Sequence, residues 1–579
     1  MTEKLWHGKN WPEGVPHDVT GYEAPLQSIL DEAAAAFPQA TYTIFEGARR
    51  TYAQVRDAAN RVANFLASRG VRKGDRVAIF LPNIPHYPEV FFGILKAGAT
   101  AVTCNPMYTA PELNFQLRDA GAKAVFVMDH PQFYPLAKEA IAGTDVGTLV
   151  VCGVGPYLPK LKGFIGGLLG KIPTAGTLEP GHLRFKDVLA ASAPTPPIFE
   201  VEPLDDVAII LYTGGTTGVP KGAALTHANL LSNVRNALQW IRISQTPGAP
   251  RDTLKRGGFH TFLGVLPWYH SFGMTLCLLC SAASASQLVC IPDPRAGDPP
   301  FTKVLEAVQR YRCTMVIGVP TIYSAFVNHP NLDSFDLTSI QACGSGGAPL
   351  PLEVIRQFEA KTGAVIFEGY GLTETSPMLT VNPTNTVQRR IGAVGLPLPG
   401  TDVKIVDLDT GLVEMAQGED GEIAASGAQI MKGYWGREDA DGEVFRTIGG
   451  RRYFLTGDIG HVDEDGFVVI TDRKKDLILV GGFNAYPKEI EEVLFTHPKV
   501  AGAAVIGKPD PNSGERVKAF IQLKVGETAT VEEILEFCKT RMAGYKRPRE
   551  VEFRSELPTS AVGKVLRRVL KDEEKAKGA

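Results

Sequence analysis

One short loop carries the residue types needed to hold phosphate groups. It is YTGGTTGVPKG, Tyr212–Gly222, and it follows an apolar run. Its glycines and threonines can turn backbone N–H groups and hydroxyls towards one point, while Lys221 adds a positive charge. The loop therefore suits a polyphosphate. It is not a Walker A loop, because the G-x-x-x-x-G-K-[ST] spacing is absent, and alone it could be an ordinary tight turn.

A second loop, EGYGLTET at Glu368–Thr375, adds a base-binding surface and a metal ligand. Its glycines permit close approach of the backbone, and Tyr370 offers a flat face for a base. Thr373 offers a hydroxyl to phosphate. Glu374 offers the single carboxylate with which Mg²⁺ is often held beside phosphate oxygens. Alone, Glu374 would be read as a surface carboxylate.

Two weaker motifs lie towards the C-terminus. The first is TGD, ending at Asp458, whose carboxylate could accept hydrogen bonds from both hydroxyls of a ribose. The second is PTSAVGKVLRR, Pro558–Arg568, in which a loop presents Lys564. Taken singly, each motif is equally consistent with a charged surface.

The segments around these loops alternate between β-rich and helical patterns. From residue 76 to residue 152 the runs RVAIFLP, TAVTCNP, AKAVFVM and TLVVCG are separated by amphipathic stretches. This alternation predicts an α/β protein, a large multi-lobed N-terminal domain with largely parallel sheets covered by helices. DVAIILY, TMVIGVP and AVIFEGYG are further predicted strands, and loops at the carboxyl ends of parallel strands bind ligands.

The pattern changes after Asp472. A charged segment, DRKKD, leads into a smaller predicted α+β domain with the strands VAGAAVIG, ERVKAFIQLK and VEFRSEL and the helix VEEILEFCKTRMAG. We therefore expect an N-terminal domain at 1–471, a hinge at 472–476 and a small, mobile C-terminal domain at 477–579.

Composition narrows the class of protein. The chain has 579 residues and a formal net charge of −3, which gives no reason to expect a nucleic-acid partner. Cys277 and Cys280 alone have C-x-x-C spacing, and two buried thiols on one apolar element are a better reading than a zinc or redox site. The sequence predicts no signal peptide and no membrane span, so we expect a cytoplasmic protein.

One segment, Gly155–Pro180, mixes three lysines with large apolar residues. Such a segment could lie on a membrane surface, which leaves peripheral membrane contact open. Its glycines and prolines weaken a helix, so a packed surface loop is the favoured interpretation. Residues 243–258 are predicted to be a surface insertion, for which the sequence suggests no function.

Together, the loops resemble the adenylate-forming superfamily of acyl-CoA synthetases, peptide-synthetase adenylation domains and luciferases. The resemblance runs from about residue 25 to residue 570 and includes LPWYHSFGM, GSGGAP, GEIAASGAQIMKGYW and GGFNAYPKEIEEVL. Within the superfamily, YTGGTTGVPKG, DRKKDLILVGGFNAYP and VTCNPMYTAPEL are most similar to bacterial long-chain fatty-acid–CoA ligases. Ala428, where proline is frequent, and Gly481, where serine is common, depart from the pattern without removing an essential group.

The resemblance implies a role for each loop. The β- and γ-phosphates of ATP would be held by Thr213, Gly214, Gly215, Thr216, Thr217, Gly218 and Lys221. The adenine would be framed by Gly347, Ala348, Pro349, Glu368, Gly369 and Tyr370. Thr373 would contact the α-phosphate, Glu374 would hold Mg²⁺, and Asp458 with Arg473 would bind the ribose.

The resemblance also implies a moving C-terminal domain. Lys564 would bridge the substrate carboxylate and the α-phosphate during adenylation. Rotation about Lys475 would then withdraw it and bring Gly481 and Gly482 to line a channel for the pantetheine of coenzyme A.

The acyl side is implied by the aromatic motif. His270 would sit beside the acyl carbonyl, although it could equally be a packed histidine. The other expected substrate-binding residues are Trp268, Tyr269, Met274, Tyr323, Gly346 and Met378. No acidic residue follows in HSFGMTLCLLC, so a substrate ammonium would be unpaired and an apolar acyl tail fits better.

The sequence thus predicts an ATP-, Mg²⁺- and coenzyme A-dependent fatty acyl-CoA synthetase with small-molecule substrates. Medium-chain, dicarboxylic and aryl acids stay open as substrates. A fatty acyl-AMP ligase that delivers to a carrier protein is a rival, although its characteristic insertion before the hinge is not seen. An acyl-binding, membrane-docking protein without catalysis is the rival outside enzymes. The oligomeric state, including a homodimer, is left open.

Overall fold

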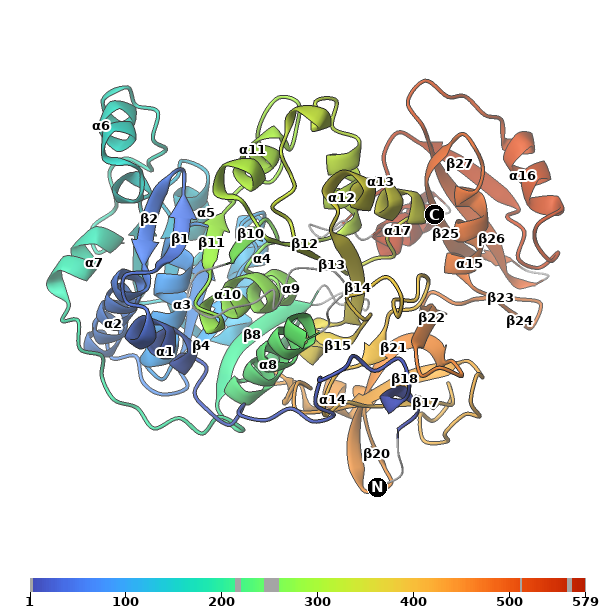
Figure 1. Ribbon diagram of the computed structural model, residues 1–579, viewed down its shortest axis with the longest axis horizontal. Coiled ribbons are helices and arrows are strands. Elements are labelled where there is room, and N and C mark those ends of the chain that lie inside the picture. Colours follow the sequence, from blue (N-terminus) through green and yellow to red (C-terminus); the bar gives the residue numbers. More distant parts are fainter. Residues whose placement is uncertain (1–3, 214–219, 244–259, 511–512, 560–564, 578–579) are drawn as a thin grey trace.

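The computed structural model describes residues 4–213, 220–243, 260–510, 513–559 and 565–577 (Figure 1). No helix within these ranges has both the length and the apolar character needed to cross a membrane. The predicted insertion at 243–258 lies, apart from its first residue, outside the described residues.

The first large sheet contains the strands predicted between residues 76 and 152. Its order in the described chain is β19-β9-β8-β4-β3-β5-β6-β7. The strands from β8 to β7 in this order run parallel, while β9 and β19 are antiparallel additions. The bounds are β3 (Arg76–Phe80), β4 (Thr100–Thr103), β5 (Ala122–Met128), β6 (Thr148–Cys152), β7 (Leu183–Arg184), β8 (Val207–Thr213), β9 (Lys221–Thr226) and β19 (Gly433–Tyr434).

The second large sheet has the order β16-β15-β14-β13-β12-β10-β11-β1-β2. Its centre, from β14 to β1, is parallel, and both ends are antiparallel. The bounds are β1 (Thr41–Phe45), β2 (Ala48–Thr51), β10 (Thr261–Gly264), β11 (Gln287–Cys290), β12 (Met315–Gly318), β13 (Ala342–Ser345), β14 (Val365–Gly371), β15 (Met378–Val381) and β16 (Leu396–Pro397). The predicted α/β class with largely parallel sheets is confirmed.

Helices cover these sheets (Figure 1). Most of them bury their apolar sides in one large core, whereas α4 and α5 pack in a second core against the first sheet. Their ends follow local sequence: α2 begins with a capping box formed by Thr51 and Gln54, and α4 ends at Gly121 in the left-handed conformation. The bounds are η1 (Leu5–His7), α1 (Ser28–Ala36), α2 (Tyr52–Ser68), α3 (His86–Lys96), α4 (Ala110–Ala120), α5 (Phe133–Ala140), η2 (Gly155–Tyr157), α6 (Lys160–Leu168), α7 (Phe185–Ala191), α8 (His227–Ile243), α9 (Ser271–Gly273), the π-helix η3 (Met274–Leu279), α10 (Cys280–Ala283), α11 (Thr302–Tyr311), α12 (Pro320–Val327), η4 (Leu332–Ser334), α13 (Leu352–Thr362) and η5 (Thr373–Thr375).

A smaller antiparallel sheet follows in the chain and carries the predicted ribose-binding residues. It comprises β17 (Asp402–Val406), β18 (Gly421–Ser426), β20 (Phe445–Ile448), β21 (Arg451–Val462) and β22 (Val468–Arg473), with α14 (Glu438–Val444) beside it. Asp458 on β21 pairs directly with Arg473 on β22.

The residues after Ile478 form a separate sheet with its own apolar core. The sheet contains β23 (Ile478–Val480), β24 (Phe483–Ala485), β25 (Val500–Asp510), β26 (Gly514–Leu523) and β27 (Glu550–Arg554), and its helices are α15 (Pro487–Phe495), α16 (Val531–Lys539) and α17 (Arg567–Lys577). The predicted smaller α+β unit is confirmed as a fold. The hinge at 472–476 and the rotation about it stay predictions.

The two cysteines with C-x-x-C spacing are buried thiols, as predicted. Cys277 lies in η3 and Cys280 begins α10, and both are free. Burial raises the pKa of the Cys277 thiol to about 12. The described residues contain no group of three or more His, Cys, Asp or Glu side chains placed to hold a metal ion.

Candidate active site

The predicted phosphate loop is the turn of a hairpin between two sheet strands. β8 ends at Thr213 and β9 begins at Lys221, and these two residues pair across the hairpin, with the Thr213 hydroxyl 3.3 Å from the Lys221 carbonyl oxygen. The predicted residues Gly214, Gly215, Thr216, Thr217 and Gly218 lie outside the described residues. The structure thus fixes both ends of the loop at the carboxyl end of a parallel strand.

Lys221 and Glu374 are brought together by a residue that the sequence reasoning missed, Tyr434. The Lys221 ammonium lies 5.4 Å from the centre of the Tyr434 ring, and the Tyr434 hydroxyl donates to Glu374 Oε1 at 2.8 Å. Burial raises the pKa of Tyr434 well above its ordinary value, so the phenol stays protonated and remains a donor. Tyr434 reaches this place because β19 pairs with β9. Tyr434 is the tyrosine of the motif GEIAASGAQIMKGYW, so the sequence could have singled it out.

Three separate segments also converge around the end of β14. Glu368 accepts a hydrogen bond from the Leu350 N–H at 3.1 Å, which ties the loop after β13 to β14. A Cβ placed on Gly346 would lie 3.2 Å from the Gly369 carbonyl oxygen and 3.2 Å from the ring of Phe272. Glycine allows this close approach without displacing either neighbour. The predicted adenine-binding loop Gly347–Pro349 therefore lies beside β14 and beside the aromatic motif.

The predicted ribose-binding residues form a buried polar triangle. Asp458 is 2% exposed, and its two carboxylate oxygens lie 2.9 Å from Arg473 Nε and 2.6 Å from the Tyr370 hydroxyl. Burial raises the pKa of Tyr370 well above its ordinary value. The triangle joins β14 to the smaller sheet and fixes Asp458 in one orientation.

Thr373 and Glu374 lie in η5, a single short turn that follows β14. Glu374 is 8% exposed, and its main-chain carbonyl oxygen accepts from the Met431 N–H at 2.8 Å. The backbone of this turn is thus held from the side of β19, and the Glu374 carboxylate has one oxygen not engaged by Tyr434.

The aromatic motif begins a short helical turn on the acyl side. His270 is half-buried at the N-terminus of α9, and its Nδ1 accepts from the Phe272 N–H at 3.2 Å. Desolvation lowers the pKa of His270 to about 4, so the imidazole is neutral near pH 7. Tyr269 is also half-buried, and burial raises its pKa to about 12.

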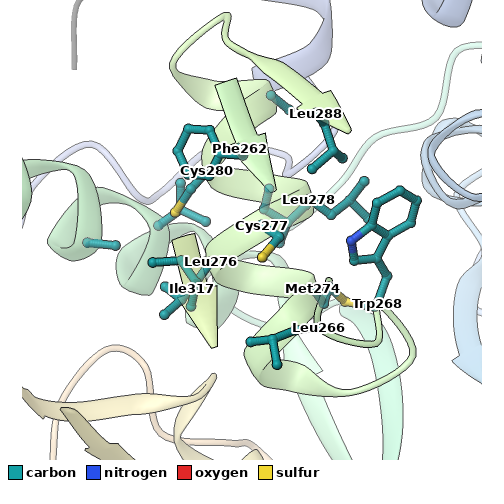
Figure 2. Packing of buried hydrophobic residues seen from close by; sticks show 14 of the residues in the cluster. Phe262, Leu266, Trp268, Met274, Leu276, Cys277, Leu278, Cys280, Leu288 and Ile317 are labelled. Atoms are coloured by element: carbon teal, nitrogen blue, oxygen red, sulfur yellow. The ribbon is translucent and has the colours of Figure 1, made fainter. Parts of the chain in front are cut away.

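A hollow with an entirely apolar surface lies behind this motif. It is lined by Ala237, Leu238, Trp240, Ile241, Phe262, Leu276, Cys280, Ile317, Phe367, Met378 and Val381. Of the expected substrate-binding residues, Met378 is in this lining. Leu276, Cys280, Phe262 and Ile317 lie on one side of the π-helix, whereas Trp268 lies on the other side (Figure 2).

Trp268, Met274 and Tyr323 are buried but are not among the lining residues of this hollow. The Trp268 carbonyl oxygen accepts from Tyr87, and its N–H donates to Asn83. The Tyr323 hydroxyl donates to the Val316 and Gly344 carbonyl oxygens, which ties α12 to two strands. These contacts hold the Trp268 main chain and the Tyr323 hydroxyl within the buried framework.

The predicted hinge carries a dense group of charges. Burial and the neighbouring Arg473 lower the pKa of Lys475 to about 8. Asp472 accepts from the Lys488 N–H at 2.9 Å, and Asp476 pairs with Arg567 at 3.1 Å. The first pair links β22 to α15, and the second links the hinge to α17, whose sequence follows Lys564. Lys564 itself lies outside the described residues.

Gly481 and Gly482 form the two-residue turn between β23 and β24. Their φ angles are +58° and +85°, a combination that favours glycine in such hairpins. Both are exposed. Beside this hairpin, a hollow of about 340 Å³ is lined by Val480, Asp510, Ser513, Arg516, Val517, Tyr545, Arg547 and Arg549. Three arginines line this hollow, which the sequence reasoning missed, although Arg516 pairs with Glu550 at 2.5 Å and with Asp510 at 3.7 Å.

Comparison with models of protein families shows to which family the chain belongs. A model of the AMP-binding enzyme family matches residues 30–435, and a model of the AMP-binding enzyme C-terminal domain matches residues 489–564. The chain belongs to the AMP-binding enzyme family. It shows the mixed α/β N-terminal domain and the small C-terminal domain of that family.

The chain is 37% identical over 579 residues to a long-chain-fatty-acid–CoA ligase of Bacillus subtilis, with 99% of each chain covered. Its fold matches the anthranilate CoA ligase AuaEII in complex with anthranoyl-AMP, with a TM-score of 0.81, 28% identity and coverage of 96% and 99%. It also matches ATP-bound MatB from Rhodopseudomonas palustris, with a TM-score of 0.76, 30% identity and coverage of 95% and 99%. The chain is an ATP-binding, adenylate-forming enzyme among the acyl-CoA ligases.

Proposed function

We propose that the chain activates a long-chain fatty acid as an acyl-adenylate and transfers the acyl group to coenzyme A. The observation that carries this proposal is the apolar hollow beside convergent polar loops. None of the described residues that line it is charged, so it suits a hydrocarbon tail and offers a second carboxylate no partner. The name of the Bacillus subtilis relative supports the same substrate class.

The first half-reaction concentrates negative charge on the oxygens around the α-phosphorus of ATP. A carboxylate is a poor acyl donor, and its attack on the α-phosphate of ATP expels pyrophosphate and gives a mixed anhydride. Preorganised donors and cations stabilise such a transition state. We assign the β- and γ-phosphates to the loop from Thr213 to Gly218 and to Lys221, and the α-phosphate to Thr373.

Glu374 fits a role as the protein ligand of Mg²⁺. Its carboxylate has one oxygen on Tyr434 and a second available, and a single carboxylate plus phosphate oxygens is a common magnesium environment. The ion would supply charge neutralisation at the phosphates. Tyr434 and the Met431 N–H would hold Glu374 in place for it.

The remaining nucleotide contacts follow from the buried triangle. Asp458 would accept hydrogen bonds from the ribose hydroxyls, with Arg473 and Tyr370 fixing its orientation. The loop Gly347–Pro349 with Glu368 would frame the adenine. His270, which is neutral near pH 7, would shape the entrance to the acyl hollow without adding a charge beside the acyl carbonyl.

In the second half-reaction, the thiol of coenzyme A has to reach the acyl carbonyl, close to the position that Lys564 would occupy in the first. We propose that the C-terminal domain turns at Lys475, so that Lys564 leaves and the hairpin of Gly481 and Gly482 lines the pantetheine path. The three arginines of the neighbouring basic hollow would bind the phosphates of coenzyme A, because guanidinium groups suit phosphate oxygens.

An aryl acid is the second candidate substrate. AuaEII, whose fold matches along nearly the whole chain, is an anthranilate ligase, and the hollow contains the aromatic rings of Trp240 and Phe367. The hollow has a volume of only about 20 Å³, so the lining side chains would have to move apart for a ring as well as for a tail, and the substrate profile decides between the two acids.

A coenzyme A-dependent AMP-release assay tests the proposal. The acids would be saturated fatty acids of graded length, with benzoate, a hydroxycinnamate and a dicarboxylate as comparators. We expect the highest kcat/KM with long chains and a requirement for Mg²⁺ and coenzyme A. A maximum with an aryl or dicarboxylic acid would refute the substrate class. Pyrophosphate release that needs no coenzyme A, with acyl-adenylate as the end product and no AMP released, would refute the ligase.

A further inference from the structure

Helix α6 carries an apolar stripe that faces solvent. Its side chains recur at helical spacing and are exposed as follows: Leu161 71%, Phe164 71%, Ile165 44%, Leu168 78% and Leu169, directly after the helix, 59%. Positions i, i+3, i+4, i+7 and i+8 form one face of a helix, and in a globular protein that face is normally turned towards the core. Here the helix stands away from the body of the molecule (Figure 1).

The face turned inward is made of glycine. A Cβ on Gly163 would lie 3.3 Å from the Gly155 carbonyl oxygen, and a Cβ on Gly166 would lie 3.1 Å from Ile172 Cγ1. The helix therefore packs closely against the segments on either side of it through residues without side chains. The apolar stripe is left outside by this packing, and turning it inward would lose the close glycine contacts.

The base of the helix is fixed to the N-terminal lobe. Tyr157, just before α6, donates to the buried carboxylate of Glu89 at 2.5 Å. The Arg50 guanidinium lies 5.2 Å from the centre of the Tyr157 ring and also binds Glu89 at 2.7 Å. These contacts hold the start of the segment, so the stripe has a defined direction relative to the lobe.

The charges within the segment that carries the stripe are of one sign. No Asp or Glu occurs from residue 146 to residue 178, whereas Lys160, Lys162 and Lys171 do. Lys162 pairs with Glu46, and within the described ranges neither Lys160 nor Lys171 has an ion-pair partner. The surface is therefore complementary to an apolar layer with a negatively charged boundary.

We propose that α6 docks the enzyme on an anionic lipid bilayer. The five apolar side chains enter the boundary between headgroups and acyl chains, and Lys160 and Lys171 meet the headgroups. Helix α6 has nine residues and is only about 14 Å long. A helix of this length cannot by itself bury the roughly 800 Å² of surface that a stable protein interface needs on each side. A bilayer requires no matching shape. The docking does not depend on which acid the enzyme activates.

Cosedimentation of the full-length protein with vesicles tests this proposal. Vesicles of phosphatidylcholine and phosphatidylglycerol at 7:3 would be compared with pure phosphatidylcholine at constant salt. We expect binding to the anionic vesicles and at least a ten-fold loss of the partition coefficient for the double variant Phe164→Ser with Leu168→Ser. The matched control, Ile198→Ser with Val525→Ser, removes two exposed apolar side chains elsewhere and should bind like the parent.

The lysines give a second, electrostatic test. Lys160→Gln with Lys171→Gln should weaken binding to anionic vesicles by roughly five-fold per lysine. Lys524→Gln with Lys575→Gln is the matched control and should have no such effect. Circular dichroism and ATP–pyrophosphate exchange with hexanoate would establish that each variant is folded.

Three results would overturn the proposal. The parent protein could fail to bind anionic vesicles, or the α6 double variant could bind as tightly as the parent. In the third, sedimentation velocity would show a dimer that the α6 double variant abolishes while vesicles are not bound, which would make a second copy the occupant of the stripe.

Discussion

The proposed nucleotide side and the proposed acyl hollow of this enzyme are built on opposite principles. On the nucleotide side, Asp458, Arg473 and Tyr370 hold one another at 2.9 and 2.6 Å, and each polar group has a defined partner. The acyl hollow is lined by apolar side chains from α8, η3, β10, β12, β14 and β15, and none of these described residues gives it a charge. The positions of individual polar groups matter on the nucleotide side, whereas the volume of the cavity matters in the acyl hollow.

This difference predicts how the two regions respond to substitution. Removal of one polar group deletes a specific interaction and can leave its buried partner unpaired, so its effect should be large and confined to one step. A change in the volume of the hollow should be graded and should depend on the length of the acid.

The largest effect is expected for Lys564→Ala. Loss of a cation that acts on the adenylation transition state should lower ATP–pyrophosphate exchange by at least about 100-fold. Thioesterification of supplied acyl-AMP should stay within a few-fold of the parent, because Lys564 is then withdrawn. Lys575→Ala, which removes an exposed lysine of α17, is the control. Equal losses in both half-reactions would contradict the assigned division of labour.

The second-largest effect on activity is expected for Asp458→Ala. It removes the proposed ribose contact and leaves Arg473 without its partner, so kcat/KM for ATP should fall roughly 30- to 100-fold, mostly through KM. Asp409→Ala, an exposed aspartate in a turn, is the matched control. Steady-state kinetics at saturating acid would measure the change. An unaltered KM for ATP would remove Asp458 from the nucleotide site.

Ala237→Leu should act through volume alone. Ala237 is 3% exposed and lines the hollow, so added methyl groups should shorten the space for a tail. We expect kcat/KM to fall about ten-fold for the longest acids and to change little for hexanoate, which is the internal control. If all chain lengths lost the same activity, the hollow would not be the acyl site.

The smallest effect concerns His270 and pH. Its folded pKa of about 4 lies below the ordinary 6.5, so the unfolded chain takes up a proton first as pH falls. The free energy of unfolding should therefore decrease from about pH 6.5 to about pH 4, by up to roughly 2 kcal/mol for a half-buried ring. His270→Gln should lack this part of the decrease in urea titrations. Parallel curves for the two proteins would contradict it.

Candidate nucleotide-binding residues could be selected from the sequence more readily than candidate acyl-binding residues, for a physical reason. Phosphate and ribose binding depends on residue types at fixed short spacings after strands, so Lys221, Glu374 and Asp458 stand out locally. Tyr434 was missed because its partners depend on the pairing of β19 with β9, about 210 residues apart in sequence.

The residues that line the hollow could not be predicted from the local sequence pattern. Any buried apolar side chain matches the pattern, and only packing decides which side of the π-helix faces the cavity. Trp268 and Tyr323 are not among the residues that line the hollow, and their role in substrate binding stays a prediction. Met378 was expected there and does line the hollow. The parallel strands and their covering helices, by contrast, follow from local periodicity and were predicted correctly. The loop favoured for residues 155–180 was wrong, because Lys160–Leu168 form helix α6.

The most direct test of the central claim is a single-turnover experiment with α-labelled ATP, Mg²⁺ and palmitate. Without coenzyme A, we predict that one equivalent of acyl-AMP forms on the enzyme and pyrophosphate is released. On addition of coenzyme A, the label should leave as AMP while palmitoyl-CoA appears in equal amount. Labelled ADP, or acyl-CoA formed without a preceding acyl-AMP, would contradict the account.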